Sequence, residues 1–438
     1  MRLKRVFKIT SITVLVISVF FTALNYLGIF LDEEPIDYSG LIPLVELDPS
    51  ENGFDVLKKG LENSAVFDER LIDNIFLKKN WDETKVSLLL EKHNDKFQLL
   101  ESALTKPGFK SNPIHFEENL PDYSSYINIV KLLLIQSEYL IKQSRTTESI
   151  ESIALALRFS QRIKTDQSAI LISYAIGNRV EYFVLHKLHE IVSTYKLTST
   201  EFAKVATLFD SVLPYSQDRF EMIFSGELAY TDTFPEEVIQ PSFLQRVEQK
   251  LDSFQISFVH PVIDMLSVPS YYFFFQKNRT KNREYLYFVH LQSQVKDSLC
   301  NEVHFQTEFT KPHFLESLGM NAIGNINSAN FIDDFVNRRC FSYFYASAIE
   351  ASVAIKRYIQ LHQSPPERLE MLIPSFLNEV PLDPFTGKPI LYNFDAQTLY
   401  SMGLNSNVGH GRQHNFVHRC YADDICSSDP TVAIQYRH

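Results

Sequence analysis

The chain has 438 residues, of which 45% are apolar, and it contains 35 Phe and 21 Tyr but only 13 Gly. This composition excludes an intrinsically disordered protein, and the length predicts about two or three domains. The small number of glycines disfavours P-loop and dinucleotide-binding proteins, because their phosphate-binding turns depend on glycine.

The first 31 residues have the pattern of a membrane anchor. Arg2, Lys4, Arg5 and Lys8 precede an uncharged apolar run over residues 9–31, and three acidic residues follow it. About 20 apolar residues in a helix cross the hydrocarbon core of a bilayer, and the basic flank stays in the cytoplasm. We therefore expect a single-pass signal anchor with a cytoplasmic N-terminus. A cleaved signal peptide is the alternative, although its apolar region is usually only about 7–15 residues long.

The charge beyond this anchor limits the possible partners. The four basic residues before the anchor leave 38 of the 42 Lys and Arg outside, against all 53 Asp and Glu, so the outer part has a formal charge of −15. Such a charge repels phosphate backbones and anionic surfaces. We expect no binding to nucleic acid. The expected partner is the lipid bilayer, through residues 9–31.

Residues 50–340 predict a helical ectodomain after a linker over residues 32–49. Apolar residues recur at spacings of three and four. The expected helices cover residues 54–60, 65–79, 81–104, 126–144, 149–164, 166–195 and 199–213. Short connections between them favour antiparallel helical hairpins. Residues 234–299 are interrupted by prolines and include five consecutive aromatic residues at 271–275, which fit either a core plug or a docking surface.

The pattern changes at residue 341. A helix over residues 345–361 and a helical turn over 367–372 are followed by alternating apolar residues at 390–394 and 398–402, which predict a β-hairpin. The remaining residues are polar and predict irregular structure. The predicted fold is therefore mainly α. It comprises a cytoplasmic basic tail (1–8), a transmembrane helix (9–31), a linker (32–49), an α-helical hairpin ectodomain (50–340) and a small α+β module (341–438).

Asp383 and Gly387 indicate a tight turn before this hairpin. Asp accepts hydrogen bonds from the backbone that follows it, Pro384 presets φ, and Gly387 permits a positive φ. We therefore interpret Asp383 as a turn-forming residue rather than as an acid catalyst.

The same segment resembles a known family. Asp383-Pro384, Gly387, Pro389, Tyr392, Tyr400-Ser401 and Gly403 occur in an order that resembles the C-terminal module of uncharacterised bacterial single-pass envelope proteins. That module is similar to the periplasmic head of the major pseudopilin of type II secretion. The resemblance implies a bacterial inner-membrane protein whose bulk is periplasmic.

The resemblance also implies a possible calcium site in the loop after the hairpin, where six to eight oxygen ligands would be needed. Its candidate ligands are Asn405, Asn407, Asp423 and Asp424. The sequence departs from the pseudopilin pattern in that Asn405 stands where Asp is usual, and Arg412 and Arg419 reduce the negative charge of the loop. The alternative is a loop held by a disulfide alone.

The four cysteines predict disulfides. All lie beyond the anchor, and an even number in an oxidising compartment favours pairing, with three possible connectivities. One connectivity closes a short loop between Cys420 and Cys426 and joins Cys300 to Cys340.

No local motif indicates catalysis. Ser193 and Lys196 match the Ser-x-x-Lys spacing of penicillin-recognising enzymes, but no Lys-Thr-Gly follows, so we interpret the match as coincidence. The leading hypothesis is a non-enzymatic interaction or structural component of the envelope. The alternatives are a membrane-tethered hydrolase of envelope polymers, since catalytic triads need not be local in sequence, and a helical binder of lipids or small molecules.

Overall fold

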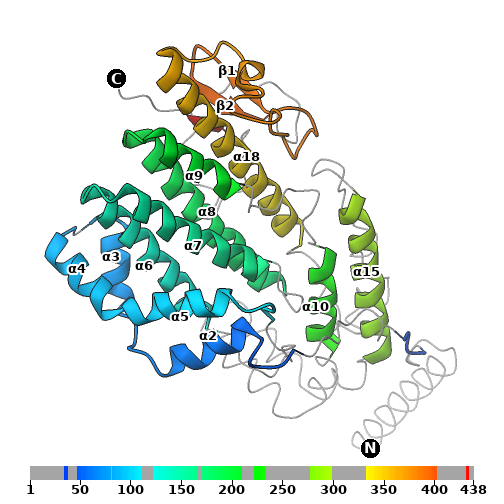
Figure 1. Cartoon of the computed structure of the whole chain (residues 1–438). Helices are drawn as coiled ribbons and strands as arrows, with labels where there is room; N and C mark the ends of the chain where they lie inside the picture. Colours follow the sequence, from blue (N-terminus) through cyan, green and yellow to red (C-terminus); the bar gives the residue numbers. More distant parts are fainter. Residues whose placement is uncertain are drawn as a thin grey trace, which may run out of the picture.

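The computed structural model describes residues 34–37, 47–79, 81–110, 122–164, 170–209, 221–232, 277–297, 332–401 and 431–433. These residues form a mainly helical protein, as predicted (Figure 1). Its elements are α2 (Gly53–Glu62), α3 (Glu69–Phe76), α4 (Glu83–Lys92), α5 (Asn94–Leu104), α6 (Tyr123–Lys142), α7 (Thr146–Lys164), α8 (Leu171–Thr194), α9 (Ser199–Phe209), α10 (Glu221–Asp232), α15 (Lys277–Asp297), α18 (Ile332–His362), the 3-10 turn η3 (Leu369–Leu372), β1 (Leu391–Asn393), β2 (Thr398–Tyr400) and β3 (Thr431–Ala433).

The predicted anchor over residues 9–31 lies outside the described residues. Within the described ranges, no helix combines the length and the apolar character that a membrane crossing requires.

Aspartate side chains begin several of the helices. Asp68, Asp82 and Asp122 each accept a hydrogen bond from a backbone N–H in the first turn of α3, α4 and α6, which satisfies a donor that the helix itself cannot pair. The single helix predicted over residues 81–104 is wrong in one respect, because the chain breaks at His93 into α4 and α5. The break lets α5 turn and pack against α2.

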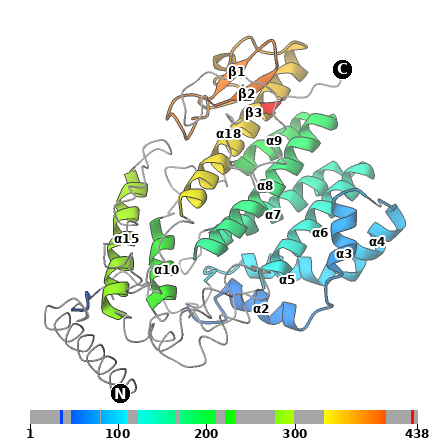
Figure 2. The same ribbon diagram turned by 180° about the vertical axis from the view of Figure 1, so that it is seen from behind.

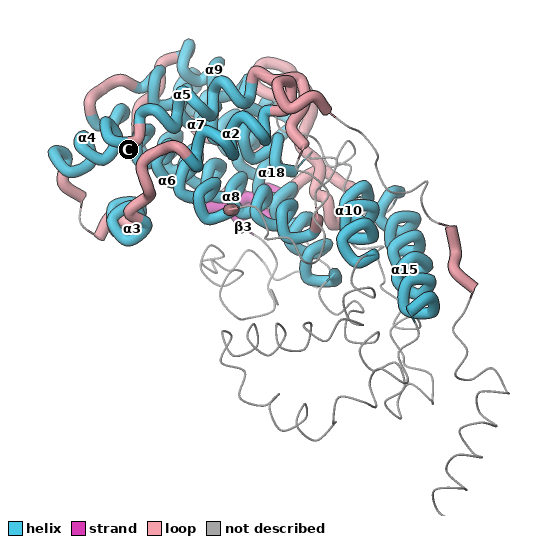
Figure 3. The backbone as a smooth tube through the Cα atoms, turned by 90° about the horizontal axis from the view of Figure 1, so that it is seen from below, coloured by secondary structure: helices cyan, strands magenta, loops and turns pink. Residues whose placement is uncertain are grey.

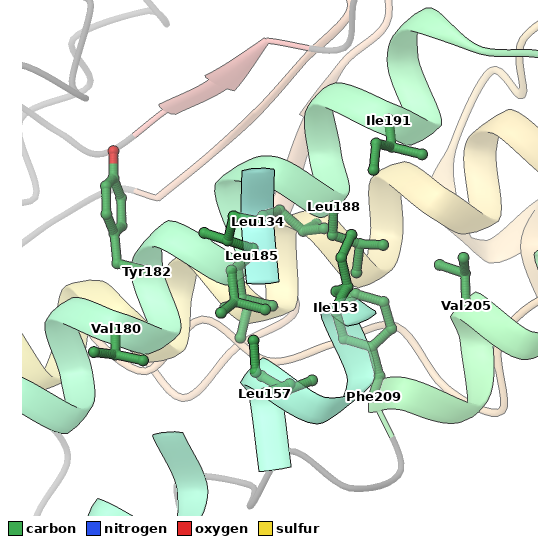
Figure 4. Close-up of a cluster of buried hydrophobic side chains, with 14 of the residues drawn as sticks. Leu134, Ile153, Leu157, Val180, Tyr182, Leu185, Leu188, Ile191, Val205 and Phe209 are labelled. Atoms are coloured by element: carbon green, nitrogen blue, oxygen red, sulfur yellow. The ribbon is translucent and has the colours of Figure 1, made fainter. Parts of the chain in front are cut away.

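Three long helices form the centre of the molecule. The hairpin between α6 and α7 turns at Ser144, which has a φ of 59°, and the Arg145 N–H bonds back to the Leu140 carbonyl at 2.9 Å. α8 then packs against both helices and against α18. Figure 4 shows aliphatic side chains of α6, α7, α8 and α9 meeting in this core.

The C-terminal sheet is small and antiparallel, in the order β1-β2-β3. β1 and β2 form the predicted hairpin, with Tyr392 opposite Leu399. The expectation of irregular structure throughout the last residues is wrong, because β3 pairs with β2 and places Val432 opposite Leu399. Three residues are too few for an alternating pattern to be recognised, and this strand forms because β2 offers an unpaired edge.

One hydrophobic core joins the helices to the sheet. It extends from Leu57 on α2 through Ile349 on α18 to Leu399 on β2, all three with no exposed surface. α18 runs unbroken across residue 341, where we predicted a domain boundary.

α10 and α15 form a separate pair beside α8. The rings of Phe224 on α10 and Phe288 on α15 lie 6.0 Å apart. Figures 2 and 3 show this pair to one side of the central helices, with the short segment of residues 34–37 next to α15.

Asp383 forms the turn before the hairpin, as predicted. It is 2% exposed. Its Oδ1 accepts the Phe385 N–H at 3.0 Å, and its Oδ2 accepts the hydroxyls of Thr386 at 3.0 Å and Ser401 at 2.8 Å. Gly387 has a φ of 65° and its N–H bonds to the Asp383 carbonyl at 2.8 Å.

Replacing this carboxylate tests its structural role. We expect Asp383→Ala to destabilise the protein by about 2 kcal/mol or more, because three donors lose their acceptor in a buried site. The matched control is Asp395→Ala in the exposed hairpin loop, which should change stability by less than about 0.5 kcal/mol. Urea unfolding followed by circular dichroism measures both, and equal effects would contradict the assignment.

Candidate functional site

Most of the predicted site residues lie outside the described ranges. These are the calcium candidates Asn405, Asn407, Asp423 and Asp424 and the cysteines Cys300, Cys420 and Cys426. Cys340 lies on α18, is fully buried and is not a free thiol. The calcium site and the disulfide pairing therefore stay predictions. Among the described residues, no group of three or more His, Cys, Asp or Glu could hold a metal ion.

The Ser-x-x-Lys pair lies where the sequence indicated, at the end of a helix. Ser193 is in the last turn of α8, and Lys196 follows the end of that helix. The Ser193 Oγ is buried and has no hydrogen-bond partner in the described part of the chain.

A buried polar cluster connects α7, α8 and α18. The Lys164 ammonium lies 3.2 Å from Glu181 Oε2 and 3.3 Å from Glu181 Oε1, and the two side chains are 2% and 1% exposed. Gln161 donates a further hydrogen bond to the same carboxylate. On the side of α18, the ring of Tyr343 lies 4.9 Å from the ammonium and 6.0 Å from the guanidinium of Arg339.

Gly177 makes room for this cluster. A Cβ at this position of α8 would lie 2.7 Å from Lys164 Cγ and 3.2 Å from the Lys164 backbone nitrogen. Glycine inside a helix costs about 0.5–1 kcal/mol relative to alanine, so its presence here reflects the close approach of α7.

The cluster has a structural role, because its ion pair joins α7 to α8 inside the protein. Both charges are removed from water, which costs free energy, and their attraction and hydrogen bonds about offset this cost. Gln161 and Glu181 come from facing helices, so the geometry holds α7 and α8 in one register. Neither charge is accessible to a substrate from solvent, because both side chains are almost fully buried.

A second cluster of charges connects α3, α6 and α8. The Lys187 ammonium lies 2.9 Å from Glu138 and 2.8 Å from Glu190, and Lys78 pairs with Glu190. Lys142 lies 3.3 Å from Glu138 on the same helix. The cluster joins the end of α3 to the two long helices.

The lysines of this cluster control the protonation of its glutamates. Burial by itself would raise the pKa of Glu190, but Lys187 and Lys78 outweigh burial and lower it to about 2. The pKa of Glu138 is lowered by the same balance between burial and Lys187. Both carboxyls are therefore charged at neutral pH.

A third polar group lies under the connection between α2 and α3. His93 is fully buried, and neither of its ring nitrogens has a hydrogen-bond partner among the described residues. Phe67 stacks on its ring at 5.4 Å. Burial, with the charge of Lys96, lowers the pKa of His93 and so favours the neutral imidazole. The Lys96 ammonium donates to Ser64 Oγ at 2.7 Å.

None of the three clusters was predicted from the sequence. Two signals were present for the first one. Gln161 and Lys164 stand one turn apart at the end of an apolar helix pattern, and Gly177 interrupts the next pattern. The partners of these residues come from other helices, and periodicity within one helix does not identify them.

The chain is a mainly helical protein with a small antiparallel sheet and with buried ion pairs between its helices. Comparisons with protein families, with curated proteins and with solved structures give no match for this chain.

Breaking the buried ion pair tests the first cluster. We expect Glu181→Gln to destabilise the protein by about 3–5 kcal/mol, because the Lys164 charge stays buried without its carboxylate. The double variant Lys164→Met with Glu181→Leu should recover most of that loss.

The matched control is Glu151→Gln, which removes an exposed ion pair with Lys204 of 3.1 Å and should cost less than about 1 kcal/mol. Thermal and urea unfolding of the purified protein measure all three variants. If Glu181→Gln and Glu151→Gln have equal effects on stability, the Lys164–Glu181 pair does not hold α7 and α8 together.

The second cluster predicts an acid-dependent stability. Because the folded-state pKa of Glu190 is about 2 and its ordinary value is 4.5, the charged carboxylate stabilises the fold above pH 4.5, and this contribution is lost as the pH falls from 4.5 to about 2. We expect the stability of Glu190→Gln to fall less than that of the wild type over this range. Glu62→Gln, at an exposed position, is the control and should follow the wild type. Parallel curves for all three proteins would contradict the prediction.

Proposed function

We propose that the protein is a membrane-anchored component of the bacterial envelope that acts as a non-enzymatic scaffold for other envelope proteins. The observation that carries this proposal is that buried ion pairs connect the helices. Lys164 pairs with Glu181, and Lys187 pairs with Glu138, so these ionisable groups join helices to one another. Groups held in this way make a rigid body, which suits a protein that presents surfaces.

The continuous core supports the same proposal. Because α18 belongs to one hydrophobic cluster with the helices before it and with the sheet after it, the C-terminal module is held in a fixed orientation. The sequence of this module resembles the pseudopilin head, a module of protein assemblies, and the turn at Asp383 and Gly387 is part of that resemblance.

Exposed apolar side chains of the C-terminal module offer a surface for the proposed protein partner. Several large apolar side chains of the C-terminal module are exposed, and apolar surface of this kind favours contact with another protein. They are Leu361 at 69%, Leu382 at 54%, Phe394 at 42%, Met371 at 40% and Ile373 at 39%.

Site-specific photocrosslinking in intact cells tests the scaffold. A photoreactive residue at Leu361 or Leu382 should give a defined crosslinked product in the membrane fraction, because these positions would face the partner. The control position is Val66, which is 86% exposed in the connection between α2 and α3. A full-length protein that yields no product from either test site and that turns over peptidoglycan, peptides or esters would overturn the proposal in favour of the hydrolase.

A further inference from the structure

Asn282 on α15 attaches the segment that follows the predicted anchor. Its Nδ2 donates to the Glu34 carbonyl at 2.7 Å, and its Oδ1 accepts the Ile36 N–H at 2.9 Å. The side chain is 4% exposed, and the two bonds join residues 248 and 246 positions apart in sequence. One amide therefore fixes residues 34–37 along α15.

This attachment limits how far α15 lies from the anchor. The apolar run ends at Leu31, three residues before Glu34. A fully extended chain spans at most about 3.6 Å per residue, so Glu34 lies within roughly 11 Å of the end of the apolar run. Figures 1 and 2 show residues 34–37 beside α15 and on the opposite side of the molecule from α4.

The two sides of α15 have different environments. Thr280, Glu284 and Phe288 are buried, and their spacing of four places them on one face, where Phe288 contacts Phe224 of α10. Leu286 is 47% exposed and lies roughly opposite this face. Asn282, four residues before Leu286, shares the face of Leu286, so residues 34–37 lie against α15 on the side opposite Thr280, Glu284 and Phe288.

The charge of α15 is opposite to that of the protein around it. The helix contains five Lys or Arg and two Asp or Glu, a formal charge of +3, whereas the part of the chain beyond the anchor has −15. Arg279 and Arg283, seven and three residues before Leu286, are half-buried on the same side. Tyr285 and Tyr287 flank Leu286, and tyrosine with basic residues is the composition found at membrane interfaces.

We propose that α15 lies on the outer surface of the bilayer, with the face of Leu286 against anionic lipid headgroups, and that Asn282 holds it there by fixing residues 34–37. This inference rests on the proposed membrane anchor. The net negative charge of the outer part would keep the rest of the molecule away from such a surface, whereas the five basic residues of α15, offset in part by Glu34 and Asp37, favour contact of this helix with it.

Tryptophan quenching in vesicles tests this orientation. The chain has one tryptophan, so full-length Trp81→Phe provides a background in which Leu286→Trp or Leu88→Trp is the sole fluorophore. Leu88 is 62% exposed on α4 and is the matched control. The proteins are reconstituted into phosphatidylcholine and phosphatidylglycerol vesicles with brominated acyl chains, and flotation of the vesicles is measured on the same samples.

We expect Leu286→Trp to lose most of its fluorescence and Leu88→Trp to lose little. Replacing phosphatidylglycerol by phosphatidylcholine should reduce the quenching of Leu286→Trp. Because α15 would contact the bilayer from whichever side the protein is inserted, the result does not depend on the direction of insertion.

Two further variants test the role of Asn282. Asn282→Leu removes both hydrogen bonds, whereas Asn282→Asp removes only the donor to Glu34 and is nearly isosteric. Each should reduce the quenching of Leu286→Trp while flotation and the circular dichroism spectrum stay unchanged. If Asn282→Leu fails to fold, Asn282→Asp still decides the question.

The outcomes separate this inference from the proposed anchor. A protein that does not float with vesicles overturns the anchor. A protein that floats, but in which Leu286→Trp is quenched no more than Leu88→Trp, overturns the placement of α15. Unchanged quenching in folded Asn282 variants overturns the role of that side chain.

Discussion

The burial of α8 constrains the arrangement of the other helices. α8 packs against α6, α7, α10 and α18, so its polar residues must find partners inside the protein. Each fully buried aliphatic side chain contributes about 1.5–3 kcal/mol, whereas a buried ion pair is about neutral. Apolar burial therefore stabilises this helix in the centre, and its charges determine which neighbours fit. Glu181 requires Lys164 from α7, and Lys187 requires Glu138 from α6.

The sequence predicted the local structure better than the contacts between elements. The sequence predicted α6, α7 and the β1–β2 hairpin, because the spacing of apolar residues that indicates each of them lies within one segment. The break at His93 was missed, because both sides of it continue the apolar spacing and only the packing of α5 on α2 separates them. β3 was missed because three residues carry no period. The turn at Asp383 was predicted because its bonds to Phe385 and Thr386 are local.

The difference between local and distant contacts also explains why the buried ion pairs and the contacts of Asn282 were difficult to predict. Lys164, Glu181 and Asn282 are unremarkable in a chain with many charged and amide residues, and their roles come from partners that are distant in sequence. The 246 positions between Ile36 and Asn282 illustrate this separation. The charge of residues 277–297 can be counted in the sequence, but no helix was predicted there. The position of α15 next to residues 34–37 required the structure.

The length of α18 has a mechanical consequence. Its 31 residues extend for about 46 Å at 1.5 Å per residue, from the α10–α15 side of the molecule to the sheet (Figure 1). A helix that packs against α8, α9 and the sheet works as a stiff spacer. In a protein held at a bilayer through its N-terminus, such a spacer would set the height at which the sheet stands above the lipid. Under the proposed anchor, the sheet would then meet other molecules at a fixed height above the lipid.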